Sequence, residues 1–126
     1  MRPKTLAEVA QLAMQGSSFD RSLSNFLDEF YACPSAAAIE EEPAILSKRA
    51  KDLVSVQDAY LAATAEELCR KYSYVLPRWT AAENRHLRWP WFASPLASLR
   101  AVLLHESPAA FRARNLFVSE NALSRA

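Results

Sequence analysis

An arginine and a histidine lie five positions apart in the segment Arg100-Ala-Val-Leu-Leu-His105. The spacing of the apolar residues around them predicts a helix. In phosphodiester cleavage, an arginine can stabilise the negative charge of the phosphate, and a histidine can transfer a proton to or from the 2′-hydroxyl or the leaving group. This pair is therefore a candidate ribonuclease site.

The spacing resembles the R-x4–6-H pattern of HEPN ribonucleases, which are small all-helical proteins. Two features of this chain depart from that pattern. Ala101 follows the arginine, where the pattern usually has a polar residue. Residues five positions apart also point about 140° apart on a straight helix, so Arg100 and His105 would converge only near a helix end. Because Glu106-Ser107-Pro108 ends the predicted helix there, a HEPN-like ribonuclease remains an alternative.

The sequence contains few of the residues that other catalytic and metal-binding motifs require. Gly16 is the single glycine of the chain, so a phosphate-binding loop or a G-x-S-x-G nucleophile motif cannot form. Cys33 and Cys69 have no metal-type spacing, and His86 and His105 lie nineteen positions apart in no metal-binding pattern. We therefore expect no metal or other cofactor, and we favour a function without catalysis.

The cysteines and the hydropathy of the chain bear on its location. Two cysteines without a disulfide framework are typical of reduced thiols in a cytoplasmic protein. No apolar run approaches the roughly 20 residues that span a bilayer. Glu8 and Gln11 make the N-terminus too polar for the core of a signal peptide. The sequence predicts a cytoplasmic protein with no membrane segment.

The net charge of +1 is the sum of opposite net charges on the two halves of the chain. Residues 1–69 carry six Lys/Arg against eleven Asp/Glu, a charge of −5, whereas residues 70–126 carry nine against three, a charge of +6. Two interpretations are open. The opposite charges can bind the two halves together, or they can leave a basic face for an acidic partner or for RNA.

Aromatic residues are concentrated between Tyr72 and Phe92, a segment that contains all three tryptophans and two prolines. Aromatic rings bury much apolar area, and a buried tryptophan needs a partner for its N–H. We interpret the segment as a buried plug with helices packed around it. If its rings were exposed instead, they could stack on single-stranded RNA beside the arginines of the basic half, so a small nucleic-acid-binding regulator is a second alternative. The arginines that this alternative uses are Arg78, Arg85, Arg88, Arg112, Arg114 and Arg125.

The apolar spacing predicts a single all-α domain over residues 1–126, with about six to eight helices around a long central helix at about 51–72. Scarcity of glycine also argues against an all-β fold, which needs many turns. The predicted helices cover residues 3–15, 19–31, 35–42, 51–72, 80–88, 95–105 and 108–114, followed by a last turn toward Arg125. Their predicted starts include Pro3, Asp20, the capping box Thr80–Glu83, and Ser-Pro pairs at 94–95 and 107–108.

Several segments together resemble a group of small all-helical bacterial proteins of the ESPxxFRxRNxF type. In chain order they are FDRSLSNFLDEFY, DAYLAATAEELCRKY, LPRWT, RWPWFAS and ESPAAFRARNLFVSENALSRA, and SPAAFRARNLFVSENAL is the most specific of them. Members of that group are often encoded beside nucleotidyltransferase-like genes, in an arrangement similar to toxin–antitoxin pairs. The resemblance implies a protein partner, such as a nucleotidyltransferase-like toxin, and it supplies no catalytic residues.

The hypothesis that we favour from the sequence is a protein-binding module with an antitoxin-like role. Arginine and tryptophan dominate the energetics of protein interfaces. Basic, amide and apolar side chains also alternate near the C-terminus in a way that a core alone does not explain. The predicted partner-binding residues are Arg112, Arg114, Asn115, Phe117, Trp79, Arg78 and Arg88.

Overall fold

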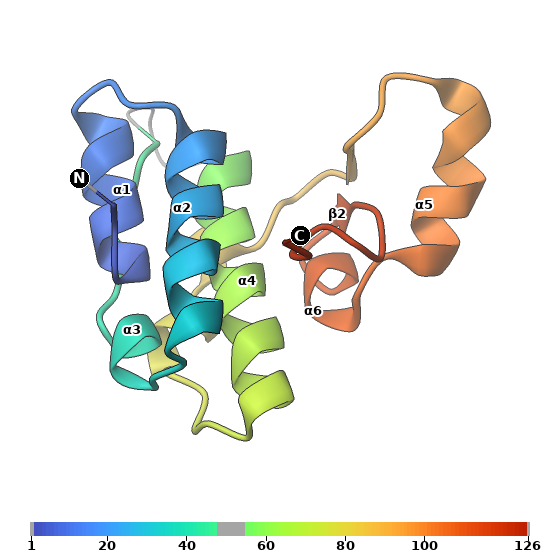
Figure 1. Cartoon of the computed structure of the whole chain (residues 1–126). Helices are drawn as coiled ribbons and strands as arrows, with labels where there is room; N and C mark the ends of the chain where they lie inside the picture. The colour runs from blue at the N-terminus through green and yellow to red at the C-terminus, as the bar shows by residue number, and fades with distance from the viewer. Residues whose placement is uncertain (1, 48–54, 126) are drawn as a thin grey trace.

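The computed structural model describes residues 2–47 and 55–125. Within these residues it contains six α-helices, three 3-10 turns and two very short strands, which confirms the all-α prediction. Figure 1 shows that α1, α2 and α4 lie side by side, and that the segment holding α5 and α6 lies to one side of them. The elements are α1 (Leu6–Met14), α2 (Phe19–Ala32), α3 (Ala37–Glu40), α4 (Val56–Tyr72), η1 (Arg78–Ala81), η2 (Glu83–Arg85), β1 (Trp91–Phe92), η3 (Ala97–Leu99), α5 (Arg100–Glu106), α6 (Ala109–Arg112) and β2 (Leu116–Phe117).

The first two helices begin at hydroxyl caps. The Thr5 side chain accepts a hydrogen bond from the Glu8 N–H (3.1 Å) at the start of α1. Gly16 follows that helix with a φ of +98°, a conformation that glycine adopts without strain. At the start of α2 the cap is Ser18, which accepts from the Arg21 N–H (3.3 Å), and the prediction of Asp20 as the cap is wrong. Asp20 lies in the first turn instead, where its carboxylate favours the positive end of the helix dipole.

Helix α4 is the longest helix among the described residues and runs through the centre of the fold (Figure 1). It begins at Val56, where the Ser55 side chain accepts from the Gln57 N–H (3.1 Å), and it ends at Ser73 in the left-handed conformation (φ 58°). The predicted beginning of this helix near residue 51 falls outside the described residues. Its small side chains Ala59, Ala62 and Ala63 are fully buried, which allows elements on both sides to approach closely.

The core consists of two clusters that share α4. The first contains the apolar faces of α1 and α2 together with Leu61, Leu68 and Trp79. The second lies between α4 and the C-terminal segment and contains Phe111, Leu116 and Val118 among others. Tyr60 contacts both clusters: its ring lies edge-on to Phe19 (6.2 Å between centroids) and to Phe111 (4.9 Å).

The aromatic segment after α4 differs from the prediction in two ways. The capping box does not form, because the Thr80 hydroxyl donates to the Pro77 carbonyl (2.7 Å) and extended backbone at Ala82 separates the two short 3-10 turns η1 and η2. The prediction of a buried plug is right for Trp79, which is 8% exposed and donates its Nε1–H to the Ile39 carbonyl (3.2 Å). It is wrong for Trp89, which is 72% exposed.

The two Ser-Pro pairs also have different roles. The Ser94 side chain accepts from the Leu96 N–H (3.2 Å), but the chain turns as η3 before α5 begins at Arg100. Ser107 is buried, accepts from the Val118 N–H (2.8 Å) and lies 2.7 Å from the Leu103 carbonyl, so it joins two segments and does not cap α6. The predicted last helical turn after Ser119 is a series of turns.

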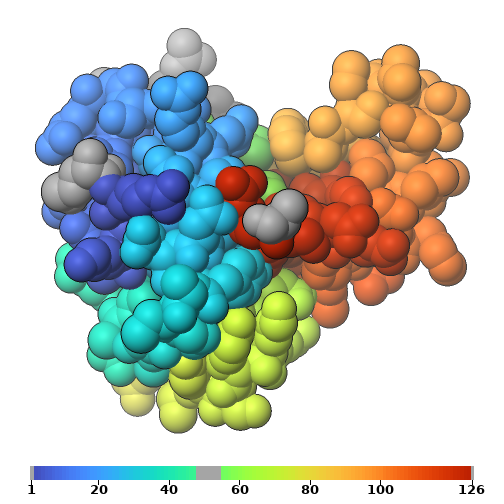
Figure 2. All heavy atoms as spheres, in the orientation of Figure 1, coloured from blue at the N-terminus to red at the C-terminus, as the bar shows by residue number. Residues whose placement is uncertain are grey.

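A short parallel bridge holds the C-terminal segment together. Strand β1 pairs with β2 in the register Trp91↔Leu116 and Phe92↔Phe117, and the Phe92 and Phe117 rings stack at 5.1 Å. Residues 93–106, which we call the arm, leave this bridge and return to it at Ser107. Figure 2 shows the arm as a protrusion on one side of the molecule. In the described part of the chain, no helix has the length and hydropathy needed to cross a membrane.

Ionisation of Tyr60 should weaken the fold at high pH. Burial raises the pKa of Tyr60 to about 12, above its ordinary value of 10.0. A raised pKa in the folded state means that the folded chain holds this proton more tightly than the unfolded chain. The stabilisation is therefore complete below about pH 10 and is lost as the pH rises toward 12, by up to roughly 3 kcal/mol.

Urea unfolding at pH 9 and pH 11 measures this loss of stability. The Tyr60→Phe variant keeps the ring contacts and removes the ionisable group, so its stability should fall less between the two pH values than that of the unmodified chain. Equal losses in both proteins would contradict the role assigned to Tyr60.

Candidate functional site

Arg114, which the sequence analysis placed on a partner-binding surface, is buried. It is 2% exposed, and its guanidinium group donates to Glu66 Oε1 (2.9 Å), to the Ala110 carbonyl (2.9 Å) and to the Thr80 carbonyl (2.7 Å). These contacts join α4, η1 and α6. The prediction that Arg114 lies on a partner-binding surface is wrong, because the side chain is buried and both terminal nitrogens of its guanidinium group donate within the fold, although Nε has no acceptor.

Three more of the predicted partner-binding residues serve the fold. Phe117 and Trp79 are 7% and 8% exposed, so neither presents its ring on the surface. Asn115 is half-buried in the left-handed conformation (φ 62°), and its Nδ2 donates to the Leu87 carbonyl (2.8 Å). Left-handed backbone is tolerated by asparagine better than by most residues. Asn115 therefore sets the turn that leads into β2.

Arg78, Arg88 and Arg112 are exposed. They are the part of the predicted surface that a partner can reach. Arg112 lies on α6 and Arg78 on η1, whereas Arg88 lies in the loop before β1. The predicted set is therefore divided between three exposed cations and four residues that hold the C-terminal segment in place.

Arg85 is the residue whose role the sequence analysis missed. It is fully buried, donates to the Asp58 carbonyl (3.3 Å) and to the Pro43 carbonyl, and lies 3.7 Å from Asp58 Oδ1. Its guanidinium carbon also lies 5.0 Å from the centre of the Trp79 ring. Burial lowers the pKa of Arg85, and the charges of Asp58 and Glu42 oppose that shift.

The Asp58 carboxylate that faces Arg85 is itself held by backbone donors. It accepts from the Leu46 N–H (2.8 Å) and from the Ser47 N–H (3.2 Å). Asp58 is fully buried at the start of α4. The pair thus ties the segment before α4, α4 itself and η2 into one polar centre.

Part of the charge asymmetry of the sequence is used in ion pairs within the molecule. Four of the nine basic residues in 70–126 contact carboxylates of the first 69 residues: Arg70 and Arg114 contact Glu66, Arg85 contacts Asp58, and Arg125 contacts Asp28 (2.9 Å). The interpretation that opposite charges bind the two halves therefore has direct support. The basic charge left for nucleic acid is correspondingly smaller.

Arg100 and His105 do not converge. Both belong to α5, which continues to Glu106, so their side chains leave the helix about 140° apart. Arg100 lies over the Phe92 ring (5.3 Å to its centre), and His105 is exposed. This geometry does not assemble the arginine–histidine pair of the HEPN alternative. Among the described residues, no group of three or more His, Cys, Asp or Glu side chains could hold a metal ion.

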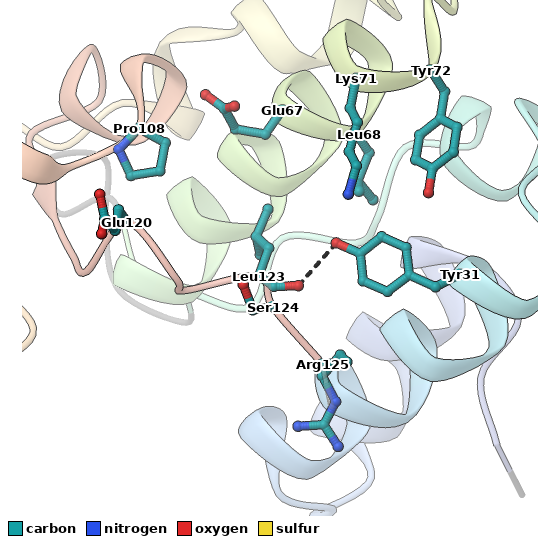
Figure 3. Close-up of a pocket in the computed structure, with 10 residues that line it drawn as sticks. All are labelled: Tyr31, Glu67, Leu68, Lys71, Tyr72, Pro108, Glu120, Leu123, Ser124 and Arg125. Atoms are coloured by element: carbon teal, nitrogen blue, oxygen red, sulfur yellow. Dashed lines mark hydrogen bonds between the residues drawn. The ribbon is translucent and has the colours of Figure 1, made fainter.

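A cavity of about 520 Å³ lies between α2, α4 and the C-terminal segment (Figure 3). The Tyr31 O–H donates to the Leu123 carbonyl (2.9 Å) across it, and Lys71 Nζ lies 4.9 Å from the centre of the Tyr31 ring. Glu67 uses one carboxylate oxygen to accept the Ala110 N–H (2.9 Å). These contacts fasten the C-terminal segment, and none of the predicted partner-binding residues lines this cavity.

The arm carries an exposed apolar surface that the sequence analysis did not identify. Leu96, Leu99, Val102 and Leu104 are 59%, 40%, 50% and 46% exposed, whereas Leu103 is 7% exposed. The signal in the sequence is the run Val102-Leu103-Leu104. Three consecutive apolar residues cover an arc of about 200° on a helix, which is wider than one contact with the body can bury.

Comparison of the chain with protein families, with curated proteins and with solved structures found no match.

Removal of the Arg114 guanidinium should cost roughly 1–3 kcal/mol of stability, because the carbonyls of the buried residues Ala110 and Thr80 lose their donor, while Glu66 keeps only its contact with Arg70. The change is Arg114→Met, measured by thermal or urea unfolding. Arg112→Met is the matched control, since Arg112 is exposed and lies two residues away, and it should change stability by less than about 0.5 kcal/mol. Similar small effects of both substitutions would contradict the assigned role of Arg114.

Proposed function

We propose that this chain is a protein-binding module that works without catalysis, and that the arm is its contact surface. The observation that carries the proposal is the exposure of four large aliphatic side chains, Leu96, Leu99, Val102 and Leu104, between residues 96 and 104. Isolated exposed apolar residues are ordinary on a protein surface, but a group of them marks an interaction site.

The packing of the arm supports this assignment. Leu103 is the one buried residue of α5, so the helix gains little from the body of the molecule. Fully burying a Leu or Val side chain contributes about 1.5–3 kcal/mol. Covering the half-exposed side chains of the arm with a partner would therefore recover a free energy that the isolated chain leaves unused.

The identity of the partner rests on the resemblance in the sequence. Proteins of the ESPxxFRxRNxF type, which this chain resembles, are often encoded beside nucleotidyltransferase-like genes, so we propose a nucleotidyltransferase-like partner and an antitoxin-like role. An antitoxin of this kind needs only a surface that covers the active site of its partner. The proposal places the chain in the cytoplasm of a bacterium, where the unpaired thiols of Cys33 and Cys69 are stable.

Acidic substitutions on the arm should break the complex. Val102→Glu and Leu104→Glu each place a charge where apolar contact is expected, and each should weaken binding at least about tenfold, which corresponds to about 1.4 kcal/mol. The measurement is titration calorimetry of the purified chain with the purified protein encoded by the neighbouring gene.

The control is Val75→Glu, a substitution of an aliphatic residue that is 92% exposed and outside the arm. It should leave the affinity unchanged, and circular dichroism should show that all three variants remain folded. A neighbouring-gene protein that binds the arm variants as tightly as the unmodified chain would refute the arm as the contact surface. Failure of the unmodified chain to bind it would refute the proposed partner.

A further inference from the structure

The direction of the side chains on α5 limits the shape of any surface that covers the arm. Leu103 is buried and therefore faces the body of the molecule. A helix turns by about 100° per residue, so Val102 and Leu104 project to opposite flanks of α5. Ala101 and His105 lie on the side turned away from the body, and both are exposed.

A flat surface that approaches the arm from outside would meet Ala101 and His105 first. Val102 and Leu104 lie about 100° to either side of the buried Leu103, on opposite flanks of the helix. A flat surface would therefore leave one or both of these side chains in water. This holds for a flat protein surface and for the plane of a bilayer. Both flanks are covered together only when α5 enters a groove.

We infer that the partner receives the arm in a groove one helix wide, with one wall on Val102 and the other on Leu104. This inference rests on the proposed function and specifies the shape of the partner. Insertion of an apolar helix face into a groove is a common mode of protein recognition, in which residues spaced by three and four positions act as anchors.

The two walls of the groove differ in charge. Leu99 lies three positions before Val102 and shares its side of the helix, so the wall against them is apolar. Arg100 lies four positions before Leu104 and shares the other side. Residues 93–105 contain no carboxylate, and Glu106 accepts the Glu120 N–H (3.3 Å) at the base of the arm. Arg100 is exposed, lies over the Phe92 ring and has no carboxylate beside it in residues 93–105, so a carboxylate on the wall that covers Leu104 would complement its charge.

Photo-crosslinking tests the groove directly. A benzophenone amino acid is placed at position 102, at position 104, or at position 75 as the control, in the full chain expressed in its own host. We expect crosslinks from 102 and 104 to two different segments of one protein, with Asp or Glu in the segment reached from 104. Position 75 should give no crosslink to that protein.

Other crosslinking results would refute the groove, the inferred class of partner or the arm as the contact surface. Crosslinks from only one flank, or from both flanks to the same segment, would show a flat contact and no groove. Crosslinks to a second copy of the chain or to lipid would replace the inferred partner class. An absence of crosslinks from both flanks, in a chain that still binds the neighbouring-gene protein, would refute the arm as the contact surface and thus the proposed function.

A separate binding measurement tests the carboxylate inferred on the wall that covers Leu104. In a complex with the crosslinked protein, Arg100→Gln should weaken binding about fivefold at low salt and should flatten the dependence of the affinity on salt concentration. His105→Gln, on the outer side of α5, should change neither quantity. A salt dependence that is the same for Arg100→Gln and the unmodified chain would refute the carboxylate on that wall.

Discussion

Burial of two guanidinium groups is the constraint on which the rest of this structure depends. A buried charge costs several kcal/mol unless hydrogen bonds and an opposite charge compensate it. Arg85 and Arg114 are 0% and 2% exposed, and their compensating groups come from α4, from the segment before it, from η1 and from α6. These elements must therefore occupy one arrangement, because displacement of any of them would leave a buried cation without its acceptor. The opposite charges of the two halves of the chain are the means by which the halves are joined.

The arm lies outside this arrangement. Its neighbours on both sides are fixed, by the β1–β2 bridge and by Ser107, whose hydroxyl lies within hydrogen-bonding distance of Leu103 and Val118. Between these fixed points the chain makes α5 with a single buried residue. The fold thus holds both ends of the arm firmly and leaves its apolar flanks uncovered. A helix that is held at both ends and keeps uncovered apolar flanks suits binding to another protein.

The long helices could be predicted because apolar periodicity and chain breakers agree. The stripe from Phe19 to Tyr31 and the stop at Gly16 predicted α2 and the end of α1 to within one residue, whereas the start of α1 predicted at Pro3 is wrong, because the helix begins at Leu6 after the Thr5 cap. Local capping signals were less reliable: Thr80 has the right spacing for a cap, but its hydroxyl bonds to Pro77. The burial of Arg85 and Arg114 could not be predicted, because arginine is almost always exposed and its burial depends on carboxylates and carbonyls that are distant in sequence. For the same reason, the predicted partner-binding residues include four that hold the fold, while the apolar spacing over 95–105 predicted a helix and did not show which of its side chains are exposed.

Native-state hydrogen exchange on the free chain measures whether the buried ion pairs fix the body as one unit while α5, held only at its ends, opens separately. We expect the amides of α4 and those of residues 109–118 to exchange together and slowly, through global unfolding, and the amides of α5 to exchange at least about a hundredfold faster through local opening. Protection of α5 equal to that of α4 would contradict a separately opening α5, and early exchange of residues 109–118 while α4 remains protected would contradict a body joined by the buried ion pairs.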